Sequence, residues 1–189
     1  MNLIVAVSAD WGIGWKNELL FRIPADLKRF KEITMGKTVV MGHSTFRSLP
    51  HMKPLSGRKN IVLSRGRVLS IPGALVVNSK EQVETGDDVF IIGGGEVYGL
   101  FLDDCTKAYV TKVDSYPKAD RFFPNLDEKD GWHLEELSEK FCDNGLTYRY
   151  CVYIKTTRLF STSRREPGCL QQSLQAAPLF STGAREARP

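Results

Sequence analysis

Short apolar runs alternate with amphipathic stretches along residues 1–155, and this pattern predicts buried strands separated by helices and loops. Residues 3–7 are continuously apolar and rich in β-branched side chains, as is typical of a central strand buried on both faces. Further strands are expected at residues 38–41, 60–63, 74–77, 89–92 and 108–113. A helix is expected to begin at Pro24, because Leu27, Phe30 and Ile33 follow it at helical spacing.

The C-terminal part of this pattern predicts a hairpin. Residues 132–141 and 146–155 mix polar and apolar positions, and between them stands Asn144-Gly145, a dipeptide that hairpin turns favour. Strands separated by helices or loops, followed by a hairpin, indicate an α/β fold. We expect a three-layer sandwich in which about four helices flank a central, mostly parallel sheet of about eight strands with an antiparallel C-terminal hairpin.

Residues 8–19 are rich in glycine, yet they carry Trp11, Ile13, Trp15 and Leu19. A loop that closes over a ligand needs such side chains, because it must exclude water when it is shut. An ordinary connection whose apolar residues pack on the core explains the same pattern equally well.

The pattern ends at Phe160. Residues 161–189 are rich in Ser, Arg, Ala, Gly, Gln and Pro and have no sustained strand or helix period. We therefore expect one domain over residues 1–160 and a disordered C-terminal extension over residues 161–189.

Composition narrows the functional classes. The chain has 189 residues, of which 42% are hydrophobic, enough for one well-filled core. Its net charge of +4 is too small to suggest nucleic-acid binding, and the apolar run near the N-terminus is too short for a signal or membrane segment. The 4 cysteines show no Cys-x-x-Cys spacing and the 3 histidines stand far apart, so no metal site is expected. These features predict a cytoplasmic protein, expected to be a monomer, with no nucleic-acid or membrane partner.

Asp26 is the candidate for chemistry within the predicted helix. It lies four residues before Phe30 and seven before Ile33, so its carboxylate follows the apolar stripe. A pocket with an aromatic floor and one acid would suit a flat ligand with an amidine-like edge. An acid in the first helical turn also interacts favourably with the helix dipole, and from the helix alone this second explanation stays open.

Two glycine-containing junctions are candidates for anion binding. Gly42 separates a predicted strand from a helix for which Ser44 or Thr45 could be the N-cap, and three glycines at 93–95 follow another strand. The third glycine of the dinucleotide fingerprint would fall on Tyr98, so a Rossmann domain in the strict sense is not supported. A tight turn or an ordinary helix start remains the alternative at each junction.

Several short motifs occur in register along the chain. They are Gly-Ile-Gly at 12–14, Ile-Pro-Ala-Asp-Leu at 23–27, Val-Val-Met-Gly at 39–42, Thr-Phe-Arg-Ser-Leu at 45–49, Leu-Ser-Gly-Arg-Lys-Asn at 55–60, Ile-Gly-Gly-Gly at 92–95, Tyr-Val-Thr at 109–111 and Phe-Phe-Pro at 122–124. Together, up to about residue 158, they resemble bacterial dihydrofolate reductase, an antifolate target. The resemblance implies reduction of 7,8-dihydrofolate to tetrahydrofolate, by hydride transfer to C6 and protonation at N5, for one-carbon, thymidylate and purine synthesis.

The resemblance implies a substrate pocket around Asp26. Asp26 would bind the 2-amino and N3 edge of the pterin with Thr111 as its side-chain partner, and Arg58 would pair with the α-carboxylate of the glutamate tail. The remaining implied substrate contacts are Ile4, Val5, Leu27, Phe30, Leu55 and Ile92.

The resemblance also implies NADPH as the cofactor. The nicotinamide end would contact Ala6, Ile13, Gly14 and Leu19, and the 2′-phosphate would meet Ser64 and Arg65. The other implied cofactor residues are Gly42, His43, Ser44, Thr45, Leu63, Gly93, Gly94, Gly95, Glu96, Val97 and Tyr98. A cis peptide bond is implied between Gly94 and Gly95.

Two residues depart from the family's usual pattern. Phe21 stands where tryptophan is usual, and its ring cannot donate the hydrogen bond that holds a water near the pterin, so Phe21 is a candidate catalytic position. His43 stands where arginine often grips the 2′-phosphate, and a mostly neutral histidine is a weaker grip. Alternative functions are a pyrimidine reductase of the riboflavin-pathway type and a catalytically weak NADPH-binding paralogue.

Overall fold

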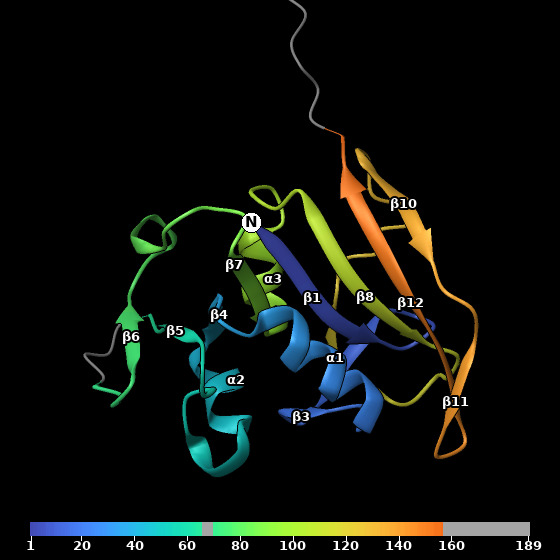
Figure 1. The fold of residues 1–189 in the computed structure, drawn as a ribbon, viewed down its shortest axis with the longest axis horizontal. Coiled ribbons are helices and arrows are strands. Elements are labelled where there is room, and N and C mark those ends of the chain that lie inside the picture. Colours follow the sequence, from blue (N-terminus) through green and yellow to red (C-terminus); the bar gives the residue numbers. More distant parts are fainter. Residues whose placement is uncertain (66–69, 157–189) are drawn as a thin grey trace, which may run out of the picture. The chain divides into compact units, whose positions relative to one another are not determined.

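The computed structural model describes residues 1–65 and 70–156 of the chain. The extension expected at residues 161–189 lies outside the described residues. A large central sheet runs through the described part in the strand order β10-β12-β8-β1-β7-β4-β5-β6, and β11 pairs with β12 (Figure 1). Its strands are β1 (Asn2–Val7), β4 (Thr38–Gly42), β5 (Lys59–Leu63), β6 (Ala74–Val77), β7 (Val89–Gly93), β8 (Lys107–Val113), β10 (Trp132–Leu137), β11 (Phe141–Asp143) and β12 (Leu146–Lys155).

The strand directions confirm the predicted mixed sheet. The pairs from β8 through β1, β7, β4 and β5 to β6 are parallel, whereas β12 runs antiparallel to β8, β10 and β11. The turn at Asn144-Gly145 joins β11 to β12, and both of its residues have positive φ angles, 50° and 77°. Asn and Gly tolerate this conformation, which explains why the dipeptide marks the hairpin.

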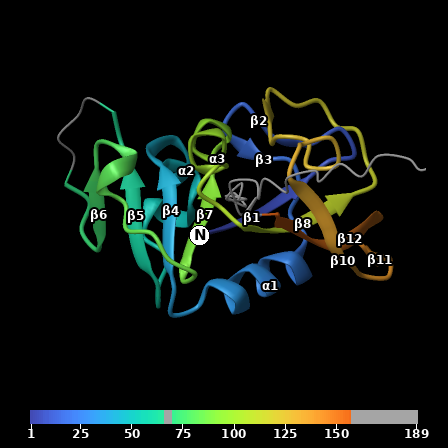
Figure 2. The same cartoon turned by 90° about the horizontal axis from the view of Figure 1, so that it is seen from above.

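Helices cover both faces of the sheet, as the sandwich prediction requires (Figure 2). The described residues form α1 (Pro24–Thr34), α2 (His43–Ser48) and α3 (Gly95–Phe101), with short 3-10 segments η1 (Pro50–Met52) and η2 (Lys80–Gln82). Phe30 of α1 and Phe46 of α2 pack with Val39, Met41 and Phe90 on one face. The helix α3 packs on the opposite face through a separate apolar cluster, to which Val97 and Phe101 belong.

Two local predictions need correction. The N-cap of α2 is Gly42, not Ser44 or Thr45, because the helix begins directly after β4 at His43. Residues 8–19 are not a simple loop, since they contain β2 (Gly12–Trp15) and β3 (Glu18–Leu19). These strands form a second, small sheet with β9 (Arg121–Phe122), a partner more than 100 residues away in the sequence.

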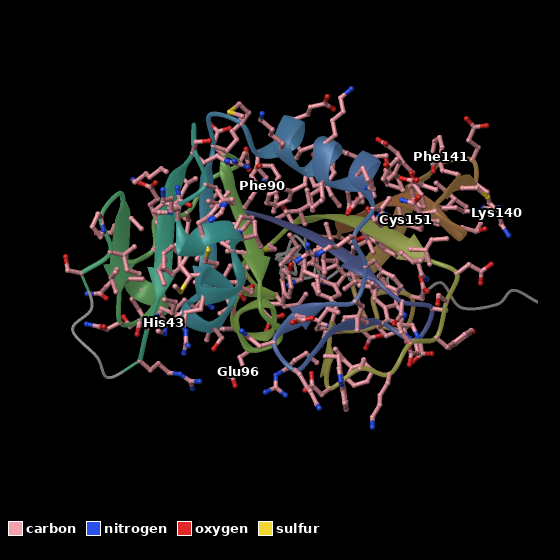
Figure 3. The ribbon with its side chains drawn as sticks, turned by 90° about the horizontal axis from the view of Figure 1, so that it is seen from below. His43, Phe90, Glu96, Lys140, Phe141 and Cys151 are labelled. Atoms are coloured by element: carbon pink, nitrogen blue, oxygen red, sulfur yellow. The ribbon has the colours of Figure 1, made fainter. Side chains whose placement is uncertain are left out.

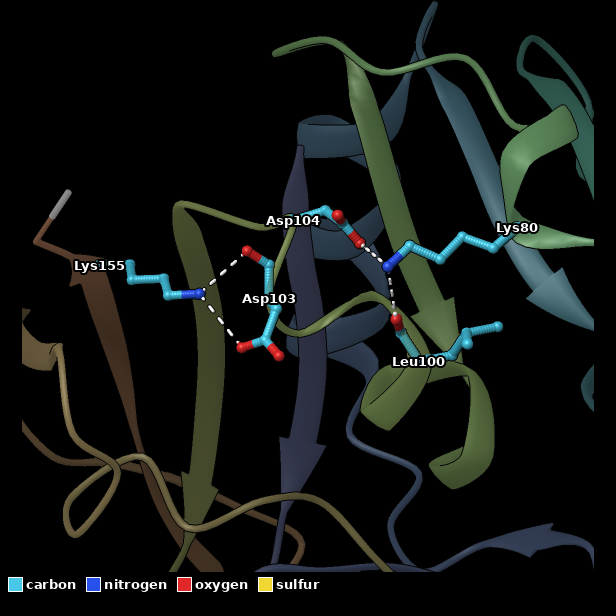
Figure 4. A network of polar contacts seen from close by, with 5 residues as sticks. All are labelled: Lys80, Leu100, Asp103, Asp104 and Lys155. Carbon is cyan, nitrogen blue, oxygen red and sulfur yellow. Dashed lines mark hydrogen bonds and ion pairs between the residues drawn. The ribbon is translucent and has the colours of Figure 1, made fainter. Parts of the chain in front are cut away.

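Polar contacts attach the end of α3 to the sheet and to η2 (Figure 4). Lys80 Nζ donates to the carbonyl oxygen of Leu100 at 3.1 Å and pairs with Asp104 Oδ2 at 2.5 Å. Lys155 Nζ of β12 donates to the carbonyl oxygen of Asp103 at 2.9 Å. Because the last carbonyls of a helix lack partners within the helix, a lysine that reaches them stabilises its end.

Candidate active site

The candidate site lies at the C-terminal ends of the parallel strands of the central sheet. β4 ends at Gly42, β5 at Leu63 and β7 at Gly93, and α2 and α3 begin directly after β4 and β7. In open α/β sheets, ligands bind in the crevice outside the carboxyl ends of the strands. The local sequence pattern of strand, glycine and helix thus places the candidate residues at one edge.

Asp26 lies in the first turn of α1, where Pro24 starts the helix. Its Oδ1 accepts a hydrogen bond from Thr111 Oγ1 of β8 at 2.5 Å. Thr111 is only 2% exposed, although it is polar, and its neighbour in register on β1 is Ala6. The structure therefore joins the acid to the threonine that the resemblance pairs with it.

Burial raises the pKa of the Asp26 carboxyl above its usual value, because the charged form loses water. The hydrogen bond from Thr111 and the positive charge of Arg29 both lower the pKa, but they do not cancel the effect of burial. A half-buried acid with a raised pKa at a sheet edge is typical of a functional site.

An apolar wall stands beside Asp26. Phe30, Leu55 and Ile92 pack against a cluster that contains Ile4 and Met41. Leu27, one residue after the acid, is 49% exposed, so it faces open space at the site rather than the core.

Val5 lies elsewhere. Neighbouring residues of a strand point to opposite faces, so Ile4 joins the cluster beneath α1 while Val5 joins the cluster on the α3 face. The side chain of Ile4, rather than that of Val5, therefore lies on the face of the sheet that carries Asp26.

Arg58 lies beyond the apolar wall. Its Cζ is 5.9 Å from the ring centroid of Phe30, and its guanidinium donates to Thr34 Oγ1 at 3.3 Å and to the carbonyl oxygen of Ser56 at 3.1 Å. Partial burial lowers the pKa of Arg58 from its usual value, because the charged form loses water. A cation beside Phe30 and an acid one helical turn before that ring would suit a long ligand with opposite polar ends.

Phe21 packs against a third cluster, formed by Ile23, Val113 and Tyr148. This cluster joins the segment before α1 to the end of β8 and to β12. Phe21 is partly buried there, and its ring offers no hydrogen-bond donor.

A groove of about 570 Å³ opens at the ends of β4, β5 and β7. The implied cofactor residues along it are Gly42, His43, Ser44, Thr45, Leu63, Ser64, Arg65, Gly94, Gly95, Glu96 and Val97. Figure 3 labels His43 on α2 and Glu96 on α3, which stand at this edge. The remaining implied cofactor residues lie outside its lining: Ala6, Ile13, Gly14, Leu19, Gly93 and Tyr98.

Sequence reasoning missed Asn17, Arg47, Leu100 and Arg121, which also line the groove. Arg47 lies one turn after His43, a spacing that could have indicated it. Arg121 carried no such signal, because it reaches the groove through the pairing of β9 with β2.

The groove is basic, and glycine lines it where a Cβ atom would come close to a neighbouring side chain. Arg47, Arg65 and Arg121 line it together with one acid, Glu96, and the exposed side chains of Arg65 and Glu96 form an ion pair. A Cβ atom added to Gly94 would lie 3.1 Å from Thr45 Oγ1, so a larger residue would crowd the groove. The cis peptide bond joins Gly93 to Gly94, not Gly94 to Gly95 as the resemblance implied.

The β2–β3 hairpin borders the same groove. Asn17 Nδ2 donates to the carbonyl oxygen of Ser44 at 3.4 Å, and Gly14 pairs in register with Leu19. Ile13 is buried and lies beside the start of α3, 3.8 Å from where a Cβ of Gly95 would stand.

Residues 1–156 match a protein family described as Dihydrofolate reductase. The chain belongs to this family. It is therefore an oxidoreductase that reduces dihydrofolate. Dihydrofolate reductase of Mycobacterium tuberculosis (strain ATCC 25618 / H37Rv) is 41% identical over 157 residues, covering 81% of this chain and 96% of that relative.

Two other relatives extend this result. Dihydrofolate reductase of Neisseria gonorrhoeae is 34% identical over 158 residues, which cover 82% of this chain and 97% of the relative. Dihydrofolate reductase of Mycobacterium leprae (strain TN) is 44% identical over 121 residues, which cover 61% of this chain and 73% of that relative. Because the chain belongs to this family, its function is that of a dihydrofolate reductase and not that of a pyrimidine reductase of the riboflavin-pathway type.

Within residues 1–65 and 70–156, no group of three or more His, Cys, Asp or Glu side chains could hold a metal ion. Among the helices of this same part, none combines the length and apolar character needed to cross a membrane.

Proposed function

We propose that this dihydrofolate reductase uses NADPH and that Asp26 binds the pterin of the substrate. The hydrogen bond between Thr111 and the partly buried Asp26, one turn before the apolar Phe30, is the observation that carries the proposal. The pterin would lie against Phe30 and Leu27, with its 2-amino and N3 edge on the Asp26 carboxylate. Its glutamate tail would extend along α1 to Arg58, which lies beside Phe30.

The residues of the groove fit NADPH by the chemistry of their donors. Arg47, Arg65 and Arg121 supply positive charge for the phosphates, and neither α2 nor α3 has a side-chain cap on its first N–H groups. The close approach of Gly94 to Thr45 leaves room for a ligand only because glycine lacks a Cβ. Bound there, NADPH supplies the hydride that is added to C6 of dihydrofolate.

The chain's own residues orient the substrate and exclude water. Asp26 fixes the pterin through two hydrogen bonds and, when ionised, increases the proton affinity of N5, to which water brings the proton. Thr111 holds the carboxylate in place. The apolar wall and the β2–β3 hairpin limit the access of bulk water. Phe21 stands beside this region without a donor, so the proton path has one protein contact fewer than a tryptophan would give.

Asp26→Asn tests the proposal directly. We expect kcat/KM for dihydrofolate to fall roughly 100-fold or more at pH 7, because the amide cannot supply the negative charge. Acidic pH should restore part of the lost activity, because the solvent then protonates more of the substrate without the help of the carboxylate. The assay follows the loss of NADPH absorbance in the presence of dihydrofolate.

Lys28→Gln is a suitable control, because the exposed side chain of Lys28 faces Glu32 and has no assigned role in binding substrate or cofactor. Unchanged turnover in Asp26→Asn would contradict the role of Asp26. A folded parent protein that binds NADPH but does not turn over dihydrofolate would instead favour the catalytically weak paralogue.

A further inference from the structure

Arg29 lies one turn after Asp26 on α1, and its guanidinium rests on aromatic rings. Its Cζ is 4.2 Å from the ring centroid of Tyr150 and 5.9 Å from that of Tyr109. A guanidinium over an aromatic face within about 6 Å is attracted by the ring's negative face. The two tyrosines therefore hold this positive charge one helical turn after Asp26 instead of leaving it free in water.

The tyrosine that holds Arg29 lies next to the threonine that donates to Asp26. Tyr150 of β12 pairs in register with Thr111 of β8, and Thr111 donates to the Asp26 carboxylate. Directly opposed residues of an antiparallel pair have Cβ atoms only about 5 Å apart. The ring under the cation and the hydroxyl under the anion are thus neighbours on one stretch of sheet.

Arg29 does not bind the Asp26 carboxylate directly. Among the ion pairs of the described residues, none joins Asp26 to Arg29, and the side-chain hydrogen bond to Asp26 comes from Thr111. A direct ion pair would compete with the amidine-like edge of the pterin. A cation held at a short distance favours the ionised acid and leaves its oxygens for the ligand.

The charge of Asp26 also acts on two other titratable groups, one on α3 and one on β12. They are Tyr98, whose hydroxyl donates to the carbonyl oxygen of Ile4 at 2.7 Å, and Tyr150. The negative charge of Asp26 contributes to the raised pKa of both phenols, and the pKa of Tyr150 reaches about 12. Both tyrosines stay neutral at pH 7, so Arg29 is the charged neighbour in this group.

We propose that Arg29, held on Tyr150, is a positioning residue that keeps the Asp26 carboxylate ionised and available for the pterin. This inference rests on the proposed role of Asp26 in substrate binding. It adds a charged residue from outside the pocket wall to the machinery of substrate recognition.

The test is a titration of Asp26 in the substrate-free enzyme, followed by NMR of carbon-13-labelled aspartate and assigned with Asp26→Asn. Arg29→Gln should raise the pKa of Asp26 by about half a pH unit or more, because it removes the favourable charge. Arg29→Lys should restore most of the difference, and Tyr150→Leu should raise the pKa less than Arg29→Gln does. Lys28→Gln is the matched control, since Lys28 is the adjacent cation, is 79% exposed and faces Glu32 at 3.9 Å.

An unchanged pKa in Arg29→Gln, or an equal shift in Lys28→Gln, would overturn the proposal. A second measurement follows KM for dihydrofolate from pH 8 to pH 6. In Arg29→Gln the ratio of KM to that of the parent should grow as the pH falls, because the neutral acid becomes populated earlier. A structural defect would raise KM by the same factor throughout.

The titration needs no substrate, so it remains informative if the proposed role of Asp26 fails. In that case Asp26→Asn would keep its turnover while the pKa of Asp26 still responded to Arg29.

Discussion

Asp26 is an acid at a position where its charged form is poorly solvated. Burial raises its pKa, and Thr111 and Arg29 only reduce that effect. A group whose pKa is higher in the folded than in the unfolded protein favours folding when it is protonated and opposes folding when it is ionised. The residue proposed to bind the substrate in its charged form is therefore a local source of instability in the free enzyme.

Asp26→Asn should consequently be as stable as the parent or more stable at pH 7. The stabilising contribution of the protonated acid is fully present below the usual pKa of 3.8 and is lost as the pH rises through the raised folded value. We expect the variant's Tm to exceed the parent's by about 1–3 °C at pH 7. The gap should widen as the pH rises above about 4 and then level off.

Differential scanning calorimetry from pH 4 to pH 8 measures this gap. A variant less stable than the parent across the whole range would mean that the Thr111 contact outweighs the cost of burying the charge. Thr111→Val serves as the companion variant, because it removes the hydroxyl that donates to Asp26.

At the scale of single residues, the sequence predicted Asp26 and Thr111 through motifs in register, and the structure brings the two together. The environment of Arg29 could not be predicted in the same way. Its environment depends on Tyr150, which lies more than 100 residues later and becomes a neighbour only when β12 pairs with β8.

At the scale of elements, the groove is built from the ends of strands and the starts of the helices that follow them. The strand pattern predicted β4, β5 and β7 nearly to the residue, because continuous apolar runs are typical of parallel strands. It did not predict β2, β3 and β9, since strands of only two to four residues are too short to show a period. Arg121 enters the groove through one of these short strands.

The ion pair between Arg65 and Glu96 links the end of β5 to the start of α3 across the groove. Both side chains are highly exposed, so the pair itself contributes little to stability. The pair matters more for cofactor binding. Arg65 is the candidate partner of the 2′-phosphate, and Glu96 would compete with that phosphate for the Arg65 guanidinium.

Arg65→Ala should narrow the preference for NADPH over NADH by about five- to tenfold, because a charge-assisted phosphate contact is lost. Glu96→Gln should widen the preference by about twofold to fivefold, since it frees Arg65. Dissociation constants for both cofactors, measured by protein fluorescence quenching, give the ratio. An unchanged ratio in Arg65→Ala would remove Arg65 from this role.

At the scale of the whole molecule, the match to the family spans residues 1–156, and the described sheet ends with β12 at Lys155. The strands, helices and candidate site lie within that span. The mixed sheet was predictable because its parallel core and its terminal hairpin leave different patterns in the sequence. The second sheet was not, because its strands come from distant segments and are defined by tertiary packing.

Deletion of residues 161–189 should leave kcat and KM for dihydrofolate and NADPH within about twofold of the parent, because the family match ends before them. Steady-state kinetics of the two proteins, purified in parallel, test this expectation. A large loss of activity would assign these residues a part in catalysis or in assembly.

Tyr98 belongs to α3, the helix at the proposed cofactor groove, yet its hydroxyl donates to the carbonyl oxygen of Ile4, on the strand beneath the proposed substrate site. The helix and the strand therefore share a buried hydrogen bond that neither can shift without affecting the other. Where one ligand displaces such a link on binding, the ligand on the other side binds with a changed affinity, and thermodynamic linkage makes the two changes equal. Cooperativity between cofactor and substrate would then be measurable from either side, in whichever order they bind.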